Sequence, residues 1–67
     1  MSPSAPADRI RTLLLRADNV LKNEGDEGDR RRRAIKALEE AREVARDPGV
    51  EPRVRELVER RLEGLGA

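Results

Sequence analysis

The 67-residue sequence contains no phenylalanine, tyrosine, tryptophan or cysteine. Each aromatic side chain buries ~150–250 Å² in a core, and disulfides are a common reinforcement of domains this small. Because both are absent, any core must be built from leucine, isoleucine, valine and alanine. A single core in a chain of this length rarely supplies more than ~3–5 kcal/mol. The sequence therefore leaves three alternatives: closely packed helices, an oligomer, or a domain of marginal stability.

The chain is rich in charge but nearly neutral overall. Charged residues make up 43% of the sequence and apolar residues 36%, and fifteen basic side chains oppose fourteen acidic ones for a net charge of +1. High charge with few bulky residues is typical of disorder, but the near-zero net charge and the regular spacing of aliphatic residues favour folding. The longest apolar run, residues 13–15, is too short for a membrane span or a secretory signal, so a cytoplasmic location is expected. The excess of arginine over lysine suggests a GC-rich bacterial source.

The first amphipathic segment follows a start that contains two prolines. Residues 1–5 are predicted to be a disordered leader, and residues 6–67 one domain of three helices. The first helix is predicted over about residues 6–23, with Ser4 as its N-cap and Pro6 in its first turn. Its apolar stripe consists of Ile10, Leu13, Leu14, Ala17, Val20 and Leu21.

Two further helices are predicted at about residues 30–46 and 51–63. Residues 23–29 hold two glycines and four acids, which indicates a loop, and Asp26 or Asp29 is suited to cap the second helix. The second helix has the apolar positions Ala34, Ala37, Leu38, Ala41, Val44 and Ala45. The third has Val50, Val54, Leu57, Val58, Leu62 and Leu65.

Turn residues mark the ends of the last two helices. Asp47-Pro48-Gly49 predicts the end of the second helix, with Gly49 in the left-handed conformation, and Gly64 is expected to be the C-cap of the third. No alternating run of β-branched residues predicts a strand. The predicted fold class is all-α: a small antiparallel three-helix bundle, or a helical hairpin with a third packing helix.

The second predicted helix resembles the second helix of a tetratricopeptide repeat. In that family an alanine is followed four residues later by a bulky residue and three later by another alanine, and a proline closes the unit. Ala34, Leu38, Ala41 and Pro48 stand at these places. Pro48 lies two residues further on than in the family, and the first helix lacks the family's Trp-Leu-Gly-Tyr pattern. The resemblance implies a helical module that binds peptides or proteins and carries no catalytic residue.

Side chains suited to catalysis are scarce. The sequence has no histidine, and its only hydroxyl residues are Ser2, Ser4 and Thr12, so no imidazole is available to activate them. Without histidine and cysteine the usual zinc ligands are missing, and the acidic loop fits no frame of an EF-hand. We expect no enzyme activity, no cofactor, no metal site and no small-molecule substrate.

The run Arg30, Arg31, Arg32 and Arg33 is a candidate site for an anion or a nucleic acid. Successive helical residues point ~100° apart, and acids precede the run, so a solvated, self-neutralised surface is the main expectation. The last two helices also have the spacing of a helix-turn-helix, in which Arg53, Arg55 and Arg60 would face the nucleic acid. Glu56, Glu59 and Glu63 are expected on that same face, which makes nucleic-acid binding unfavourable.

Three aliphatic residues outside the centres of the stripes are candidates for a partner interface. Leu15 lies on the opposite flank of its helix, and Ile35 and Leu62 lie at the margins of theirs. Isolated exposed leucines are also common without any function. The expected function is a non-catalytic protein-interaction module or small adaptor, with a protein partner or a second copy of the chain. The alternative is a nucleic-acid-associated regulator that uses Arg30–Arg33 and the arginines of the third helix.

Overall fold

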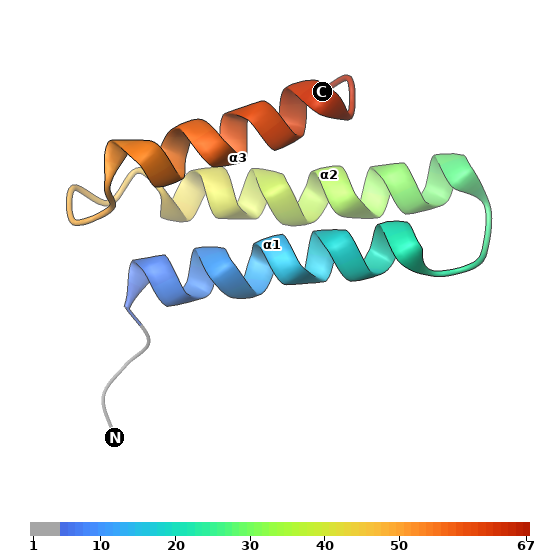
Figure 1. The fold of residues 1–67 in the computed structure, drawn as a ribbon, viewed down its shortest axis with the longest axis horizontal. Coiled ribbons are helices and arrows are strands. Elements are labelled where there is room, and N and C mark those ends of the chain that lie inside the picture. The colour runs from blue at the N-terminus through green and yellow to red at the C-terminus, as the bar shows by residue number, and fades with distance from the viewer. Residues whose placement is uncertain (1–4) are drawn as a thin grey trace.

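The computed structural model describes residues 5–67, which form three α-helices joined by short loops (Figure 1). The helices are α1 (Pro6–Lys22), α2 (Glu27–Val44) and α3 (Pro52–Gly64), and the described residues contain no strand. Successive helices run antiparallel, and α1 and α3 both pack against α2 (Figure 1). The predicted all-α class is confirmed.

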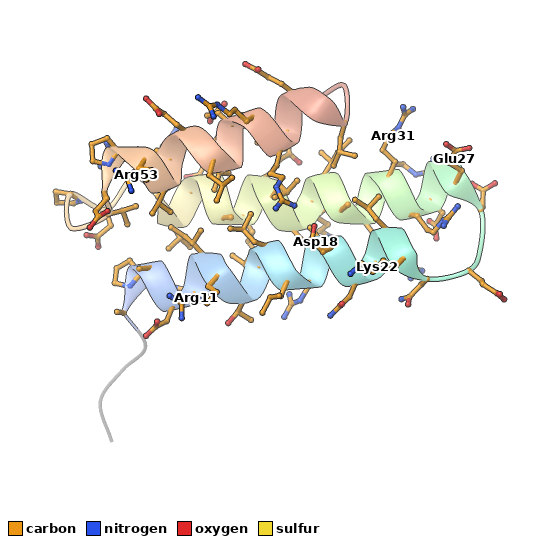
Figure 2. All side chains as sticks on the ribbon, viewed as in Figure 1. Arg11, Asp18, Lys22, Glu27, Arg31 and Arg53 are labelled. Atoms are coloured by element: carbon orange, nitrogen blue, oxygen red, sulfur yellow. The ribbon has the colours of Figure 1, made fainter. Side chains whose placement is uncertain are left out.

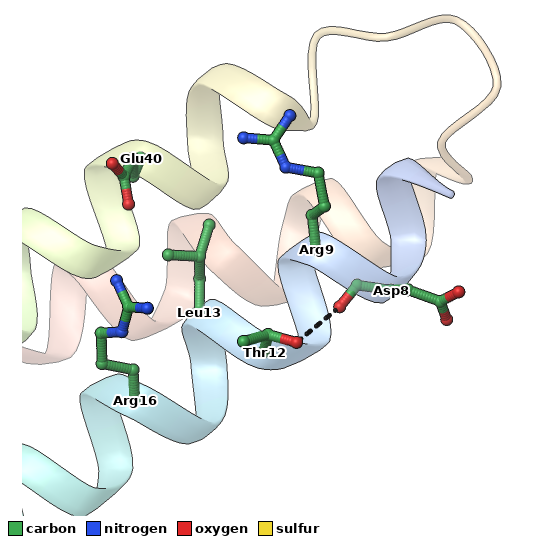
Figure 3. A pocket seen from close by; sticks show the side chains of 6 residues that line it. All are labelled: Asp8, Arg9, Thr12, Leu13, Arg16 and Glu40. Carbon is green, nitrogen blue, oxygen red and sulfur yellow. Dashed lines mark hydrogen bonds between the residues drawn. The ribbon is translucent and has the colours of Figure 1, made fainter. Parts of the chain in front are cut away.

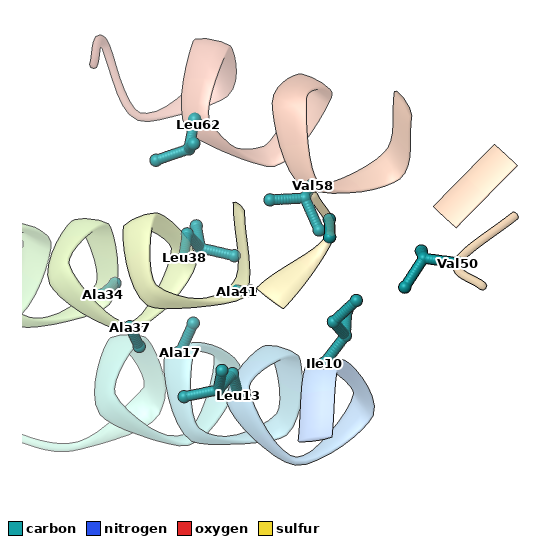
Figure 4. Packing of buried hydrophobic residues seen from close by; sticks show 11 residues of the cluster. Ile10, Leu13, Ala17, Ala34, Ala37, Leu38, Ala41, Val50, Val58 and Leu62 are labelled. Atoms are coloured by element: carbon teal, nitrogen blue, oxygen red, sulfur yellow. The ribbon is translucent and has the colours of Figure 1, made fainter. Parts of the chain in front are cut away.

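Aliphatic side chains from all three helices meet in one core (Figure 4). The buried members are Ile10, Leu13, Ala17, Ala34, Ala37, Leu38, Ala41, Ala45, Val50, Val58 and Leu62. The part that α2 supplies is alanine except for Leu38, so α1 and α3 can approach α2 closely. Ile10, Leu38 and Val58, one from each helix, are the largest fully buried side chains.

The prediction of which residues are buried is wrong at three leucines. Leu21 and Leu57 were expected in the core but are 37% and 40% exposed. The rest of the described chain covers both side chains only in part. Leu62 was expected at a margin but is only 2% exposed, because its side chain belongs to the core that α3 shares with α2.

The second helix begins earlier than predicted, at Glu27 instead of about residue 30. Asp26 is its N-cap, and the Asp26 carboxylate accepts a hydrogen bond of 3.0 Å from the backbone N–H of Asp29. This satisfies one of the free amides of the first turn. Of the two caps that the sequence offered, the structure uses Asp26. The predicted cap Ser4 of α1 lies outside the described residues, and Ala5 holds the N-cap position without a side-chain bond.

The helix ends also differ from the predictions. Gly64 is the last residue of α3, and Leu65 is the C-cap. Gly66 takes the left-handed conformation with φ of 79°, and Gly66 N–H and Ala67 N–H donate to the carbonyls of Glu63 and Leu62. These two bonds form a Schellman motif.

The turn after α2 is built by an aspartate instead of by a left-handed glycine. The φ of Gly49 is not positive, so the prediction for this residue is wrong. The Asp47 carboxylate accepts from Gly49 N–H at 2.8 Å, and the Asp47 carbonyl accepts from Val50 N–H at 3.0 Å. Asp47 therefore turns the chain through its own side chain.

Candidate functional site

The arginine run is divided between different partners. Arg30 Nη1 donates to the carbonyls of Leu21 and Asn23, at 3.2 and 2.8 Å, and so caps the C-terminal end of α1. Arg33 lies 3.2 Å from an Asp29 oxygen, and Arg32 lies 3.8 Å from the other. Arg31 is exposed at the start of α2 (Figure 2). The four side chains therefore form no continuous basic patch, as the helical spacing predicts.

Arg55 has the same capping role at the next helix end. Its Nε donates to the Ala45 carbonyl at 2.6 Å, and its Nη2 donates to the Val50 carbonyl at 3.1 Å. It thereby caps α2 and holds the loop that leads into α3. Arg55 is exposed, as the sequence predicts, but its guanidinium is occupied by backbone carbonyls, which weighs against the use of Arg55 in a helix-turn-helix.

The charged side chains of α3 are sorted onto two sides of the helix. Glu59 faces α2, where one of its oxygens lies 3.9 Å from Nε of Arg42. Arg61 faces α1, and its Nη1 donates to Asp18 Oδ1 at 2.6 Å. Glu56 and Glu63 are one turn on either side of Glu59 and share its side. Glu56 and Glu63 are also one helical turn from Arg60, so the expected mixture of acids and arginines on the exposed side of α3 stays a prediction.

A cleft lies between α1 and α3, and Leu38 of α2 forms its bottom. Its volume is about 250 Å³. Ala17, Leu38, Leu21 and Leu65 provide apolar lining, and the remaining lining residues are Asp18, Arg60, Arg61 and Gly64. Small-molecule sites usually have ~300–1,000 Å³, so this cleft suits one anchoring side chain of a larger partner better than a free metabolite.

The cleft belongs to a longer strip of surface, which we call the α1/α3 face. On α1 it includes Arg11, Leu14, Asp18, Leu21 and Lys22. On α3 it includes Arg53, Leu57, Arg60, Arg61 and Gly64. Figure 2 shows Arg11, Asp18, Lys22 and Arg53 on the side turned toward the viewer. At the end of this strip, beyond α3, Leu21 and Leu65 also border a second hollow with Glu27, Arg30 and Arg31.

The opposite side of the α1/α2 hairpin has a polar hollow (Figure 3). Asp8, Arg9, Thr12, Leu13, Arg16 and Glu40 line it. Thr12 does not point a free hydroxyl into this hollow, because its Oγ1 donates to the Asp8 carbonyl at 3.1 Å. Basic and acidic side chains are mixed here, in contrast to the α1/α3 face.

The three residues predicted as a partner interface do not lie together. Leu15 is 57% exposed on α1, as its position predicts. Its neighbours one turn away are polar: Arg11, Thr12, Asp18 and Asn19. Ile35 is half-buried against the core, and Leu62 is buried within it. Of the three, only Leu15 is available to a partner.

The residues that form the cleft were not singled out from the sequence as a site. Leu21 and Leu57 were predicted to lie in the core. Asp18 and Arg61 are 43 positions apart in the sequence, so their pairing does not follow from local spacing. A helical wheel shows which residues flank a stripe, but not which flank a third helix leaves open.

Within residues 5–67 no group of histidine, cysteine or acidic residues is arranged to hold a metal ion. None of the described helices is long and apolar enough to cross a membrane.

Comparisons with known proteins do not assign the chain to a class. No family model, no curated protein and no solved structure matches the sequence or its fold. Function must therefore be argued from the geometry of the α1/α3 face.

Proposed function

We propose that this chain is a non-catalytic protein-interaction module that receives its partner in the α1/α3 cleft. The observation that carries the proposal is the apolar lining of this cleft, formed by Ala17, Leu21, Leu38 and Leu65 and open to solvent. Leu57, one turn before Arg61, extends the apolar surface along α3. Binding energy in protein interfaces is concentrated where an anchoring side chain fills such a pocket within a polar rim.

The resemblance to a tetratricopeptide repeat belongs to the same proposal. Ala34, Leu38 and Ala41, which carry the resemblance, are buried between the helices. A hairpin with a third helix parallel to the first is compatible with such a module. The expected cytoplasmic location is part of the proposal as well.

The alternative function, a nucleic-acid-associated regulator, has less support. It relied on Arg30–Arg33 and on the arginines of α3, but Arg30 and Arg55 donate to backbone carbonyls. The chain also has no aromatic side chain on which bases could stack.

Capture on the immobilised chain tests the proposed function. The informative variant is Gly64→Leu: a Cβ added at Gly64 has no heavy atom of another residue within 4 Å, and Gly64 lies at the wall of the cleft. This variant blocks the cleft without disturbing the core. Leu15→Gln is the comparison variant, because Leu15 lies outside the cleft at the edge of the α1/α3 face, one turn from Arg11 and Asp18.

We expect the wild type and Leu15→Gln to capture the same protein from cells that make this chain, and Gly64→Leu to lose it. Equal capture by Gly64→Leu would contradict the proposal. Loss in Leu15→Gln alone would move the interface to Leu15. A solution mass of two copies that falls to one copy in Gly64→Leu would identify the partner as a second copy of the chain.

A further inference from the structure

The distribution of charge around the cleft indicates the chemistry of its partner. The α1/α3 face has five basic side chains, Arg11, Lys22, Arg53, Arg60 and Arg61, and a single carboxylate, that of Asp18. Its local excess is four positive charges, whereas the whole chain carries +1. The positive charge is therefore concentrated on one side of the molecule, and the other sides are acidic in balance.

Intramolecular pairing leaves most of this positive charge available. Asp18 is engaged by Arg61 at 2.6 Å. Among the acids of α3, Glu59 is turned toward Arg42 of α2, and Glu56 and Glu63 border the face one turn from Arg60 but form no ion pair with it in the described chain. Arg11, Lys22, Arg53 and Arg60 have no ion-pair partner among the described residues. Outside the face, Arg32, Arg33 and Arg46 have one, whereas Arg9, Arg16, Arg31 and Lys36 have none within residues 5–67.

The apolar residues of the face exclude a purely electrostatic ligand. Leu21 and Leu57 are exposed between the basic side chains, and Leu38 lies at the bottom of the cleft. A phosphate backbone would gain nothing from these leucines. An amphipathic helix would cover them with its own apolar side chains, as in other complexes where a helix lies in an apolar groove.

We infer that the partner of the α1/α3 face is an acidic amphipathic helix. It places an aliphatic anchor in the cleft and its carboxylates against Arg53, Arg60 and the basic residues of α1. The inference rests on the proposed function and specifies its partner. Opposite charge on the two surfaces accelerates their encounter and fixes their orientation.

Fluorescence anisotropy with labelled synthetic peptides tests this inference. The probe is an amidated peptide of about four helical turns, with leucines at i, i+3, i+4 and i+7 and glutamates on its remaining faces. The comparison peptides are one with lysine in place of each glutamate and one with the acidic composition in scrambled order. A short DNA duplex is the fourth ligand.

Two pairs of substitutions make the test specific. Arg53→Gln with Arg60→Gln removes two charges from the α1/α3 face. The control, Arg9→Gln with Arg16→Gln, removes two charges from the opposite hollow. We expect the acidic peptide to bind more tightly than the others, the first pair to weaken it about tenfold and the control pair to leave it unchanged. Thermal unfolding of each variant verifies that the fold is intact.

The other outcomes overturn the inference in different ways. If the lysine peptide binds as tightly as the acidic one and Gly64→Leu abolishes this binding, the inference of an acidic partner is overturned. The cleft is then still supported as a protein-binding site. Tight, steeply salt-dependent binding of the duplex that is lost in the arginine variant favours a nucleic acid instead. Absence of binding by every peptide overturns the inference, whereas the proposed function is then decided by the capture experiment.

Discussion

Arg30 and Arg55 occupy the same position in successive helices, and both cap the end of the preceding helix. Each is the fourth residue of its helix, and each donates to carbonyls at the end of the helix before it. The last carbonyls of a helix have no intrahelical partner. A guanidinium can reach two or three of them at once because its donors are arranged as a fork. Two of the thirteen arginines are thus structural.

Replacing Arg55 with lysine should lower the free energy of unfolding by ~1–2 kcal/mol. A lysine ammonium keeps the charge but cannot hold the carbonyls of Ala45 and Val50 in the same geometry, and hydrogen bonds to charged groups are worth ~1.5–3 kcal/mol each. Urea unfolding measures the change. Arg53→Lys is the control, because Arg53 is exposed on the same helix and has no such bonds. Equal stability of the two variants would contradict the capping role.

At the level of the helix, the two glycines at the end of α3 have opposite requirements. Gly64 is helical with open space around its position, whereas Gly66 has a φ of 79°. Alanine is better than glycine in a helix but is strained at positive φ. The sequence alone does not separate them, since either glycine could end the helix.

Gly64→Ala should therefore stabilise the domain by up to ~1 kcal/mol, and Gly66→Ala should destabilise it by a similar amount. The melting temperatures of the two variants should move in opposite directions from the wild type. A shift of both in the same direction would show that α3 ends differently.

Prediction from the sequence succeeded where local spacing decides the structure. The period of the aliphatic residues located all three helices and most of the core, including Ile10, Leu38 and Val58. Prediction failed where the role of a residue depends on its contacts with another helix. Asp26 and Asp29 are both suitable caps, and the roles of Arg30 and Arg55 require knowing which carbonyls lie near them. The open flank at Leu21 and Leu57 likewise depends on where α3 packs.

For the molecule as a whole, a small aliphatic core sets the limit of stability. Leu38 is 1% exposed and lies at the centre of this core, between α1 and α3. Truncation of a buried leucine to alanine costs ~2–5 kcal/mol, and a core of this size supplies ~3–5 kcal/mol in total. The same residue lies at the bottom of the cleft, so the core and the candidate site are continuous.

Leu38→Ala should consequently leave much of the population unfolded, whereas Leu15→Ala, on the exposed flank of α1, should change stability by less than ~0.5 kcal/mol. Far-ultraviolet circular dichroism at room temperature distinguishes the two. A fully helical Leu38→Ala variant would show that the core is stabilised by contacts beyond those within this chain.

The charged surface of the molecule is organised around the same cleft. Salt links such as Arg42–Glu59 and Arg61–Asp18 join α3 to its two neighbours, yet exposed pairs of this kind contribute only ~0.2–1 kcal/mol each. Their larger consequence is for the surface: they take up Asp18 and Glu59 and leave the basic side chains of the α1/α3 face exposed.

The most direct test of this account is a nuclear magnetic resonance titration of the isotope-labelled chain with the acidic amphipathic peptide. Shifts of the backbone amides should be concentrated at residues 17–22 and 57–65, which form the cleft, and the amides of Arg9, Thr12 and Glu40, around the opposite hollow, should remain unchanged. Shifts confined to that hollow, or no shifts at peptide concentrations well above those of the chain, would contradict the claim that α1 and α3 form a binding surface.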